Sequence, residues 1–255
     1  RAEDGDFINR EPGQSSDMDL ISPELWKNIT SLSTADSISI DPHKFGFVPY
    51  PCGAVLMRDY RAREFVAFDA PYTGSKKEDG FGGFLGKWTL EGSRPGAAAI
   101  SCRLSQLALP LTSEHHGSLL RECISITRKL EKRLLDVFEG VEEAVLIPLK
   151  DAETTAFCFF LVPDSDSCLN EINDFNEAVC RMMTVDGRED INEYSFIISK
   201  TSVEGDVYSH VIRERFEEAG LHDVDFGSSD SITMLRVFIM NPFVAEWEGH
   251  GSSVG

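Results

Sequence analysis

The sequence has 255 residues, of which 42% are hydrophobic, enough to bury one large core or two small ones. Its formal net charge is −19 at pH 7, and nucleic acid is excluded as a partner because no basic run is present to neutralise a row of phosphates. We also find no signal peptide and no apolar run long enough to cross a bilayer, so we expect a cytoplasmic protein without a membrane partner.

The cysteines are scattered through the chain without the paired spacing of a metal site or a redox motif. We therefore expect reduced thiols in a reducing compartment and no bound metal. The six positions are Cys52, Cys102, Cys123, Cys158, Cys168 and Cys180.

Residues 1–20 mix charges with glycine, proline and serine and show no apolar periodicity, which is typical of a flexible loop or insert. The aspartates in this segment are interpreted as solvated carboxylates. A short helix follows, because Ser22 is a suitable N-cap and Pro23 suits the first helical position.

The next segment predicts two short strands, at residues 37–40 and 54–57, joined by an irregular stretch that holds His43 and Lys44. Pro42 ends the first strand, because it donates no ladder hydrogen bond. Two interpretations of Lys44 stay open on this pattern. It either extends into water from a strand end, or it lies between buried strands and forms a Schiff base with a carbonyl cofactor against which His43 packs.

Two later segments carry further candidate residues. Residues 65–83 are rich in glycine and charge, as in a mobile loop or lid, and Tyr72 within them is interpreted on this pattern as a packing anchor. Residues 90–96 form a polar turn that leads into a helix. This turn is either an ordinary capped turn or a phosphate site that uses Ser93 and, less clearly, Arg94.

Beyond residue 113 the pattern predicts a long amphipathic helix, with Ser113 as its N-cap and Phe138 near its end. The adjacent His115 and His116 on this helix are interpreted as surface residues. An antiparallel α+β domain follows, with helices over a sheet. Its strands are predicted at residues 144–147, 157–162, 194–200 and 233–240, and its helices at 167–183 and 206–219.

Four blocks of this chain, taken in order, resemble one enzyme family. They are DPHKFGFVPYPCGAVLMRD, YRAREFVAFDAPYTG, LEGSRPGAAA and SQLALPL. The first is similar to the lysine motif of pyridoxal-phosphate-dependent group II amino-acid decarboxylases, and most of all to that of the bacterial tyrosine decarboxylases. The likeness runs from about residue 36 to about residue 243 and is strongest through Leu111.

The resemblance implies a role for each candidate residue. Lys44 would hold pyridoxal 5'-phosphate as an imine, with His43 at the phosphate or the imine. Tyr72 would close over the neighbouring subunit's site and protonate the substrate carbon. Ser93 would reach the partner subunit's cofactor phosphate in a homodimer, and Tyr50 would line the substrate pocket.

The resemblance also implies the fold. The class is α/β, a PLP-dependent transferase-like fold (fold type I). Residues 1–20 would be a loop, 21–140 the end of the large cofactor domain, 141–243 a small α+β domain and 244–255 a tail. The family's phosphate loop, ring-stacking histidine and pyridine-nitrogen aspartate have no counterpart here, so we expect an amino-terminal portion of the same enzyme to supply them.

The function implied is decarboxylation of an L-amino acid to its amine and CO₂, with tyrosine or a related aromatic amino acid as the substrate. Decarboxylation of another amino acid such as glutamate is an alternative, although no cation for a side-chain carboxylate is identified. A second alternative is a catalytically silent scaffold or dimerisation fragment that keeps the fold without the chemistry.

Overall fold

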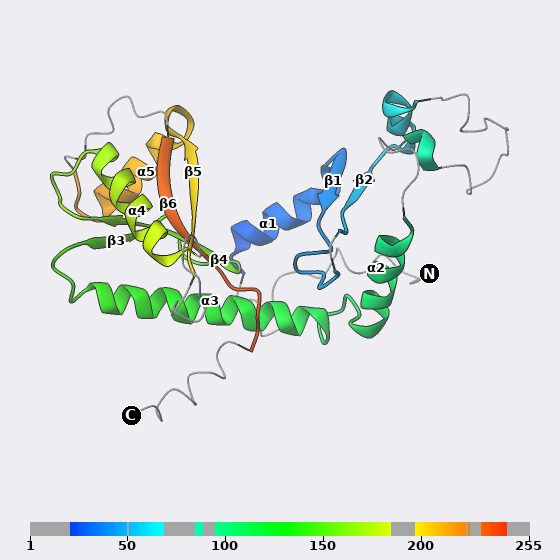
Figure 1. The fold of residues 1–255 in the computed structure, drawn as a ribbon, viewed down its shortest axis with the longest axis horizontal. Coiled ribbons are helices and arrows are strands. Elements are labelled where there is room, and N and C mark those ends of the chain that lie inside the picture. The colour runs from blue at the N-terminus through cyan, green and yellow to red at the C-terminus, as the bar shows by residue number, and fades with distance from the viewer. Residues whose placement is uncertain are drawn as a thin grey trace. The chain divides into compact units, whose positions relative to one another are not determined.

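The structure is a computed structural model, and it describes residues 21–49, 51–68, 85–88, 95–184, 197–222, 224 and 231–243. The chain divides into two compact units. The described residues of unit 1 lie within Pro23–Ser118, and those of unit 2 lie within Leu119–Gly255 together with residues 21–22. Figure 1 shows the elements of both units. The domain boundaries expected at residues 140 and 243 stay predictions.

Unit 1 begins with helix α1, Pro23–Ser31, which starts at the predicted proline, and continues into the short 3₁₀ helix η2, Leu32–Thr34. Strands β1, Ser37–Ile40, and β2, Ala54–Met57, then pair antiparallel, with Ser37 opposite Met57 (Figure 1). Both strands occur at the predicted residues, β1 from its alternation of polar and apolar side chains and β2 from its apolar run.

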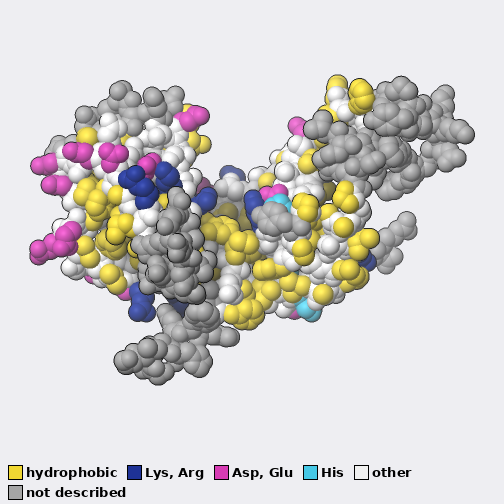
Figure 2. Space-filling view, viewed as in Figure 1, with side chains coloured by type: hydrophobic (Ala, Val, Ile, Leu, Met, Phe, Trp, Pro, Cys, Tyr) yellow, Lys and Arg dark blue, Asp and Glu magenta, His cyan; other side chains and the backbone are white. Residues whose placement is uncertain are grey.

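The expectation that β1 and β2 are buried is wrong for the described residues. Every residue of β2 is exposed, and Val55 keeps 62% of its surface accessible. Alternation predicts which face of a strand is apolar, but burial needs a second layer packed on that face. Figure 2 shows hydrophobic side chains on the surface of unit 1.

Two 3₁₀ helices follow β2: η3, Tyr60–Val66, and η4, Leu85–Trp88. The Arg63 guanidinium lies 3.9 Å from the Trp88 ring centroid, and the Trp88 indole N–H donates to Glu64 Oε1 at 3.1 Å. A cation over an aromatic ring and a hydrogen bond therefore join η3 to η4. Tyr72 lies between them in the sequence, outside the described residues.

Helices α2, Ala97–Ala108, and α3, His116–Phe138, come next, and α3 confirms the predicted long amphipathic helix. It begins three residues after the expected N-cap. The Ser113 hydroxyl donates to the Glu114 carboxylate at 2.8 Å, so this side chain is engaged with its neighbour instead of with the helix start.

Unit 2 contains a four-stranded antiparallel sheet in the order β3-β4-β6-β5, and this confirms the predicted antiparallel sheet (Figure 1). Its strands are β3 Val145–Pro148, β4 Ala156–Val162, β5 Ser199–Glu204 and β6 Ser231–Phe238. Strand β5 begins later than expected, and residues 194–196 of that prediction lie outside the described residues.

Apolar side chains on both faces of this sheet are buried. Phe160 and Val162 of β4 share one cluster with Ile212 and Phe216 of helix α5, Gly205–Glu218. The alternate residues Phe157, Phe159 and Leu161 face a second cluster, against which the end of α3 and the second half of helix α4, Leu169–Met183, pack. The period-2 alternation of β4 therefore divides its side chains between two cores.

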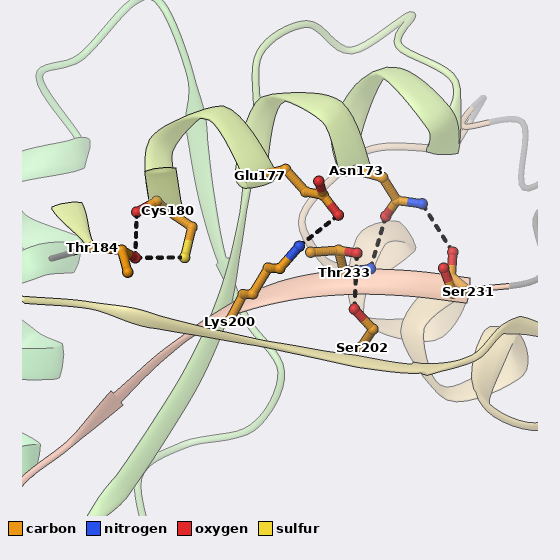
Figure 3. Close-up of polar contacts among 8 residues, drawn as sticks. All are labelled: Asn173, Glu177, Cys180, Thr184, Lys200, Ser202, Ser231 and Thr233. Atoms are coloured by element: carbon orange, nitrogen blue, oxygen red, sulfur yellow. Dashed lines mark hydrogen bonds and ion pairs between the residues drawn. The ribbon is translucent and has the colours of Figure 1, made fainter. Parts of the chain in front are cut away.

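Helix α4 is bonded to both β4 and β6 through two asparagines one turn apart. The Asn176 side chain, fully buried, accepts from Leu161 N–H at 3.0 Å and donates to Leu161 C=O at 2.8 Å. Asn173 accepts from Thr233 N–H at 2.8 Å and donates to the Ser231 carbonyl at 2.9 Å. Figure 3 shows the Asn173 contacts beside the Lys200–Glu177 ion pair. The two asparagine side chains thus take the place of a neighbouring strand for these backbone groups of β4 and β6.

Helix α5 ends at Glu218, two residues before the predicted glycine. Gly220 adopts a φ of 84°, a left-handed conformation that glycine reaches without steric cost, and Leu221 N–H donates back to Phe216 C=O at 2.9 Å. Among the described residues, no helix combines the length and the apolar character needed to span a membrane.

Candidate functional site

The candidate site is the turn between β1 and β2, residues 41–49, which we call the lysine turn. Lys44 N–H donates to Asp41 C=O at 3.0 Å, and Phe47 N–H donates to Lys44 C=O at 3.0 Å. Val48 N–H then donates to Pro42 C=O at 3.1 Å, and Val48 is buried. Three successive backbone hydrogen bonds therefore fix the path of the chain on both sides of Lys44.

Gly46 is required by the packing of this turn. A Cβ atom built at position 46 would lie 2.4 Å from the Pro42 carbonyl oxygen, so no larger residue fits without moving the backbone. The next residue, Phe47, has a φ of 52°, in the left-handed region that non-glycine residues rarely occupy. The close approach and the disfavoured φ both show that the turn is held by its surroundings.

Lys44 itself is half-exposed, so the expectation of a lysine enclosed by buried strands is wrong in this structure. Its Nζ lies 2.7 Å from Asp41 Oδ2, and the two side chains retain 55% and 41% of their exposure. The hydrogen bond from Lys44 lowers the pKa of the Asp41 carboxyl below its ordinary value. The amine is therefore accessible from solvent, as attachment of a cofactor aldehyde requires.

His43 bonds the lysine turn to the chain as it returns toward β2. Its backbone N–H donates to Cys52 C=O at 3.3 Å, and its ring Nδ1 also contacts this oxygen. A carbonyl oxygen only accepts, so the proton lies on Nδ1. The Cys52 thiol is buried and donates to the Ala98 carbonyl of α2 at 3.7 Å, and this burial raises the pKa of the thiol.

Two further side chains contact the turn from α2 and α3. The Ser105 hydroxyl donates to the Gly46 carbonyl at 3.1 Å, and His116 Nε2 contacts the Phe45 carbonyl oxygen. The interpretation of His116 as a surface residue is therefore wrong. It is half-buried, because its ring packs on Phe47 at a centroid distance of 5.8 Å.

The described residues bring together two of the predicted site residues, His43 and Lys44. The other three, Tyr50, Tyr72 and Ser93, lie outside the described residues, as does Arg94. Across the part of the chain that the structure describes, no three His, Cys, Asp or Glu side chains form a group that could bind a metal. All six cysteines are free thiols, as expected.

Comparison with family models decides how this turn is interpreted. The model described as "Pyridoxal-dependent decarboxylase conserved domain" matches residues 16–162, more than half of the chain, and the lysine turn lies inside the match. The chain belongs to this family of pyridoxal-dependent decarboxylases. A second model, "Tyrosine decarboxylase, C-terminal", matches residues 130–251. The predicted family, the fold type I class and the pyridoxal phosphate cofactor are thereby confirmed.

The relatives are much longer than this chain. An L-tyrosine decarboxylase of Enterococcus faecium is 29% identical over 88% of this chain, which spans 37% of that protein. An L-tyrosine/L-aspartate decarboxylase of Methanocaldococcus jannaschii is 30% identical over 48% of this chain and 29% of its own length. Among solved structures, mouse CSAD has a TM-score of 0.49 and 18% identity, over 89% of this chain and 40% of that one. The family assignment rests on the match over residues 16–162.

The residues of the lysine turn fit pyridoxal phosphate as a bound group. A primary amine that solvent can reach, on a backbone fixed by hydrogen bonds, is what covalent capture of an aldehyde needs. Lys44 would hold the cofactor, and His43 lies next to it on the same turn. When bound, the cofactor would supply a ring that withdraws electrons from a bond next to the bound amine.

Proposed function

We propose that this chain is the carboxyl-terminal part of an enzyme that decarboxylates an L-amino acid, most specifically L-tyrosine or a related aromatic amino acid. The observation that carries the proposal is the accessible Lys44 on a rigid turn inside the segment that matches the decarboxylase family. The L-tyrosine decarboxylase of Enterococcus faecium, similar over 88% of the chain, supports the aromatic substrate.

Five side chains act on the substrate and the cofactor in this proposal. Lys44 would hold the cofactor through its side-chain amine, and His43 would orient the bound group. Tyr72 donates the proton that replaces the lost carboxylate, and Ser93 contacts the cofactor phosphate of the partner subunit. Tyr50 lines the pocket for the substrate side chain.

The working enzyme is proposed to contain an amino-terminal portion and to form a homodimer. Relatives nearly three times as long as the matched segment support the additional portion. An exposed apolar stripe on α2 and the residues after it supports it as well, because such a stripe is normally covered. Its members, Ile100, Leu104, Leu107 and Leu111, recur at helical spacing. The free thiols suit a reducing compartment such as the cytoplasm.

An acidic substrate is the second candidate, because the relative from Methanocaldococcus jannaschii is an L-tyrosine/L-aspartate decarboxylase. The experiment that separates the candidates measures CO₂ release by the complete enzyme over a panel of tyrosine, phenylalanine, aspartate and glutamate. The proposal predicts the highest kcat/KM for tyrosine. A preference for aspartate or glutamate rejects the aromatic assignment, and release from none of the substrates by enzyme that holds cofactor favours the silent scaffold.

The rate of amine formation by the complete enzyme tests Tyr72. Replacement of its hydroxyl in Tyr72→Phe removes the proposed proton donor, so amine formation slows by about 10²-fold while cofactor binding is retained. Unchanged amine production by this variant rejects the proton-donor role.

A further inference from the structure

The imidazole of His116, the first residue of α3, contacts the lysine turn at two places. Its Nε2 atom contacts the carbonyl oxygen of Phe45, the residue immediately after Lys44. Its ring also packs on Phe47, at 5.8 Å between centroids and 59° between the planes. One side chain from α3 therefore contacts a backbone acceptor and an aromatic ring on the same turn.

The chemistry of the first contact assigns the proton. A carbonyl oxygen has no hydrogen to give, so Nε2 of His116 is the donor, in the neutral or in the charged imidazole. The adjacent His115 is directed differently, because its Nδ1 lies 2.9 Å from the hydroxyl of Thr112. The two histidines can therefore be compared as a matched pair.

The Phe45 carbonyl is part of a backbone that needs external support. Phe47 occupies the left-handed region, and such a conformation persists only where packing determines it. Phe47 also meets the ring of Phe45 edge-on, at 6.2 Å between centroids. His116 contacts both residues, and so it restrains the backbone on the carboxyl side of Lys44.

We propose that His116 is a positioning residue for Lys44. Its N–H bond to the Phe45 carbonyl and its packing on Phe47 fix the peptide that follows the lysine, so the lysine amine is directed consistently toward the cofactor aldehyde. This inference rests on the proposed function, because it assumes that Lys44 binds pyridoxal phosphate. It assigns no contact between His116 and the substrate or the cofactor.

The test uses the complete enzyme and three variants. His116→Phe keeps a ring for Phe47 and removes the donor, whereas His116→Gln keeps an N–H donor and removes the ring. His115→Phe is the control for an adjacent histidine. Three quantities are measured: the rate at which added pyridoxal phosphate attaches to apoenzyme, the amide hydrogen exchange of residues 41–49, and the melting temperature.

We expect His116→Phe to attach the cofactor about tenfold more slowly and to exchange faster in the lysine turn, because a misplaced reacting group loses rate steeply. His116→Gln should remain within about threefold of the wild type, since the donor is restored, and His115→Phe should match the wild type. The kcat of His116→Phe should fall more than its KM changes. Equal melting temperatures exclude a general loss of stability.

The inference would be overturned if His116→Phe attached the cofactor, and exchanged the amides of residues 41–49, at the rates of the wild type. It would also be overturned if His116→Gln and His116→Phe were impaired equally. If His116→Phe does not fold, His116→Gln decides, because loss of attachment rate together with loss of turn protection in that variant contradicts a donor role. If the wild type attaches no cofactor at Lys44, the proposed function fails. Hydrogen exchange then decides the inference. The inference is overturned unless residues 41–49 exchange faster in His116→Phe than in the wild type.

Discussion

Nζ of Lys44 lies 2.7 Å from Oδ2 of Asp41, three residues earlier on the same turn. The pair places a carboxylate beside the amine that we assign to the cofactor, and this carboxylate belongs to the residue that follows β1. An ammonium paired in this way must give up its proton before it attacks an aldehyde. The Asp41 carboxylate therefore favours the resting, charged form of Lys44.

Asp41→Asn tests this relationship. Removal of the negative charge disfavours the ammonium form, so attachment of pyridoxal phosphate at neutral pH should become about two- to fivefold faster, the range that an exposed ion pair supports. The measurement is the apoenzyme attachment rate. Asp59→Asn is the control, because it breaks another exposed ion pair, with Arg61, away from the lysine turn. Slower attachment in Asp41→Asn would contradict the account.

Gly46→Ala tests the packing of the lysine turn. The added Cβ meets the Pro42 carbonyl oxygen at 2.4 Å, so the backbone must move, and we expect a loss of about 1–3 kcal/mol in stability with weaker cofactor binding. Gly53→Ala is the matched control. Its Cβ meets nothing within 4 Å, so its stability should stay within about 0.5 kcal/mol of the wild type. Equal effects of the two substitutions on thermal unfolding would reject the steric explanation.

Asn176→Ala tests the bridge between α4 and β4. It removes the partners of Leu161 N–H and Leu161 C=O in a buried position, and we expect a loss of about 2–4 kcal/mol. Asn173→Ala, at a half-buried position on the same helix, should cost about 1 kcal/mol. Urea unfolding of the two variants measures the difference. A smaller loss for Asn176→Ala than for Asn173→Ala would be inconsistent with this geometry.

The stability of unit 2 should depend on pH through Glu131. Burial raises the pKa of this carboxyl, although its two oxygens each accept from Ala152 N–H at 3.1 Å, which acts in the opposite direction. A carboxyl with a higher pKa in the folded state binds its proton more readily there than in the unfolded chain. The free energy of unfolding therefore declines as the pH rises from the ordinary glutamate value through the folded pKa.

Glu131→Gln should remove this decline, because the amide does not titrate. Unfolding of wild type and variant is compared at several pH values, with Asp136→Asn, an exposed substitution on the same helix, as the control. Parallel pH curves for the wild type and Glu131→Gln would show that Glu131 does not contribute to the dependence.

Local sequence patterns predicted most of the elements. The apolar spacing along α3 and the alternation in β4 are local signals, and both elements occur where they were expected. The supports of the lysine turn had no such signal. Ser105 and His116 contact it from 59 and 71 residues away, and only the folded path of α2 and α3 brings them there. Burial of β2 was also unpredictable, because it depends on what covers the strand.

The central claim is that the amine of Lys44 binds the cofactor. The most direct test reduces the complete enzyme with borohydride after pyridoxal phosphate is added, digests it, and locates the pyridoxyl group by peptide mass. The account predicts the label on Lys44, with none at this position in Lys44→Ala. A label on another lysine, or no label on protein that binds the cofactor, would contradict it.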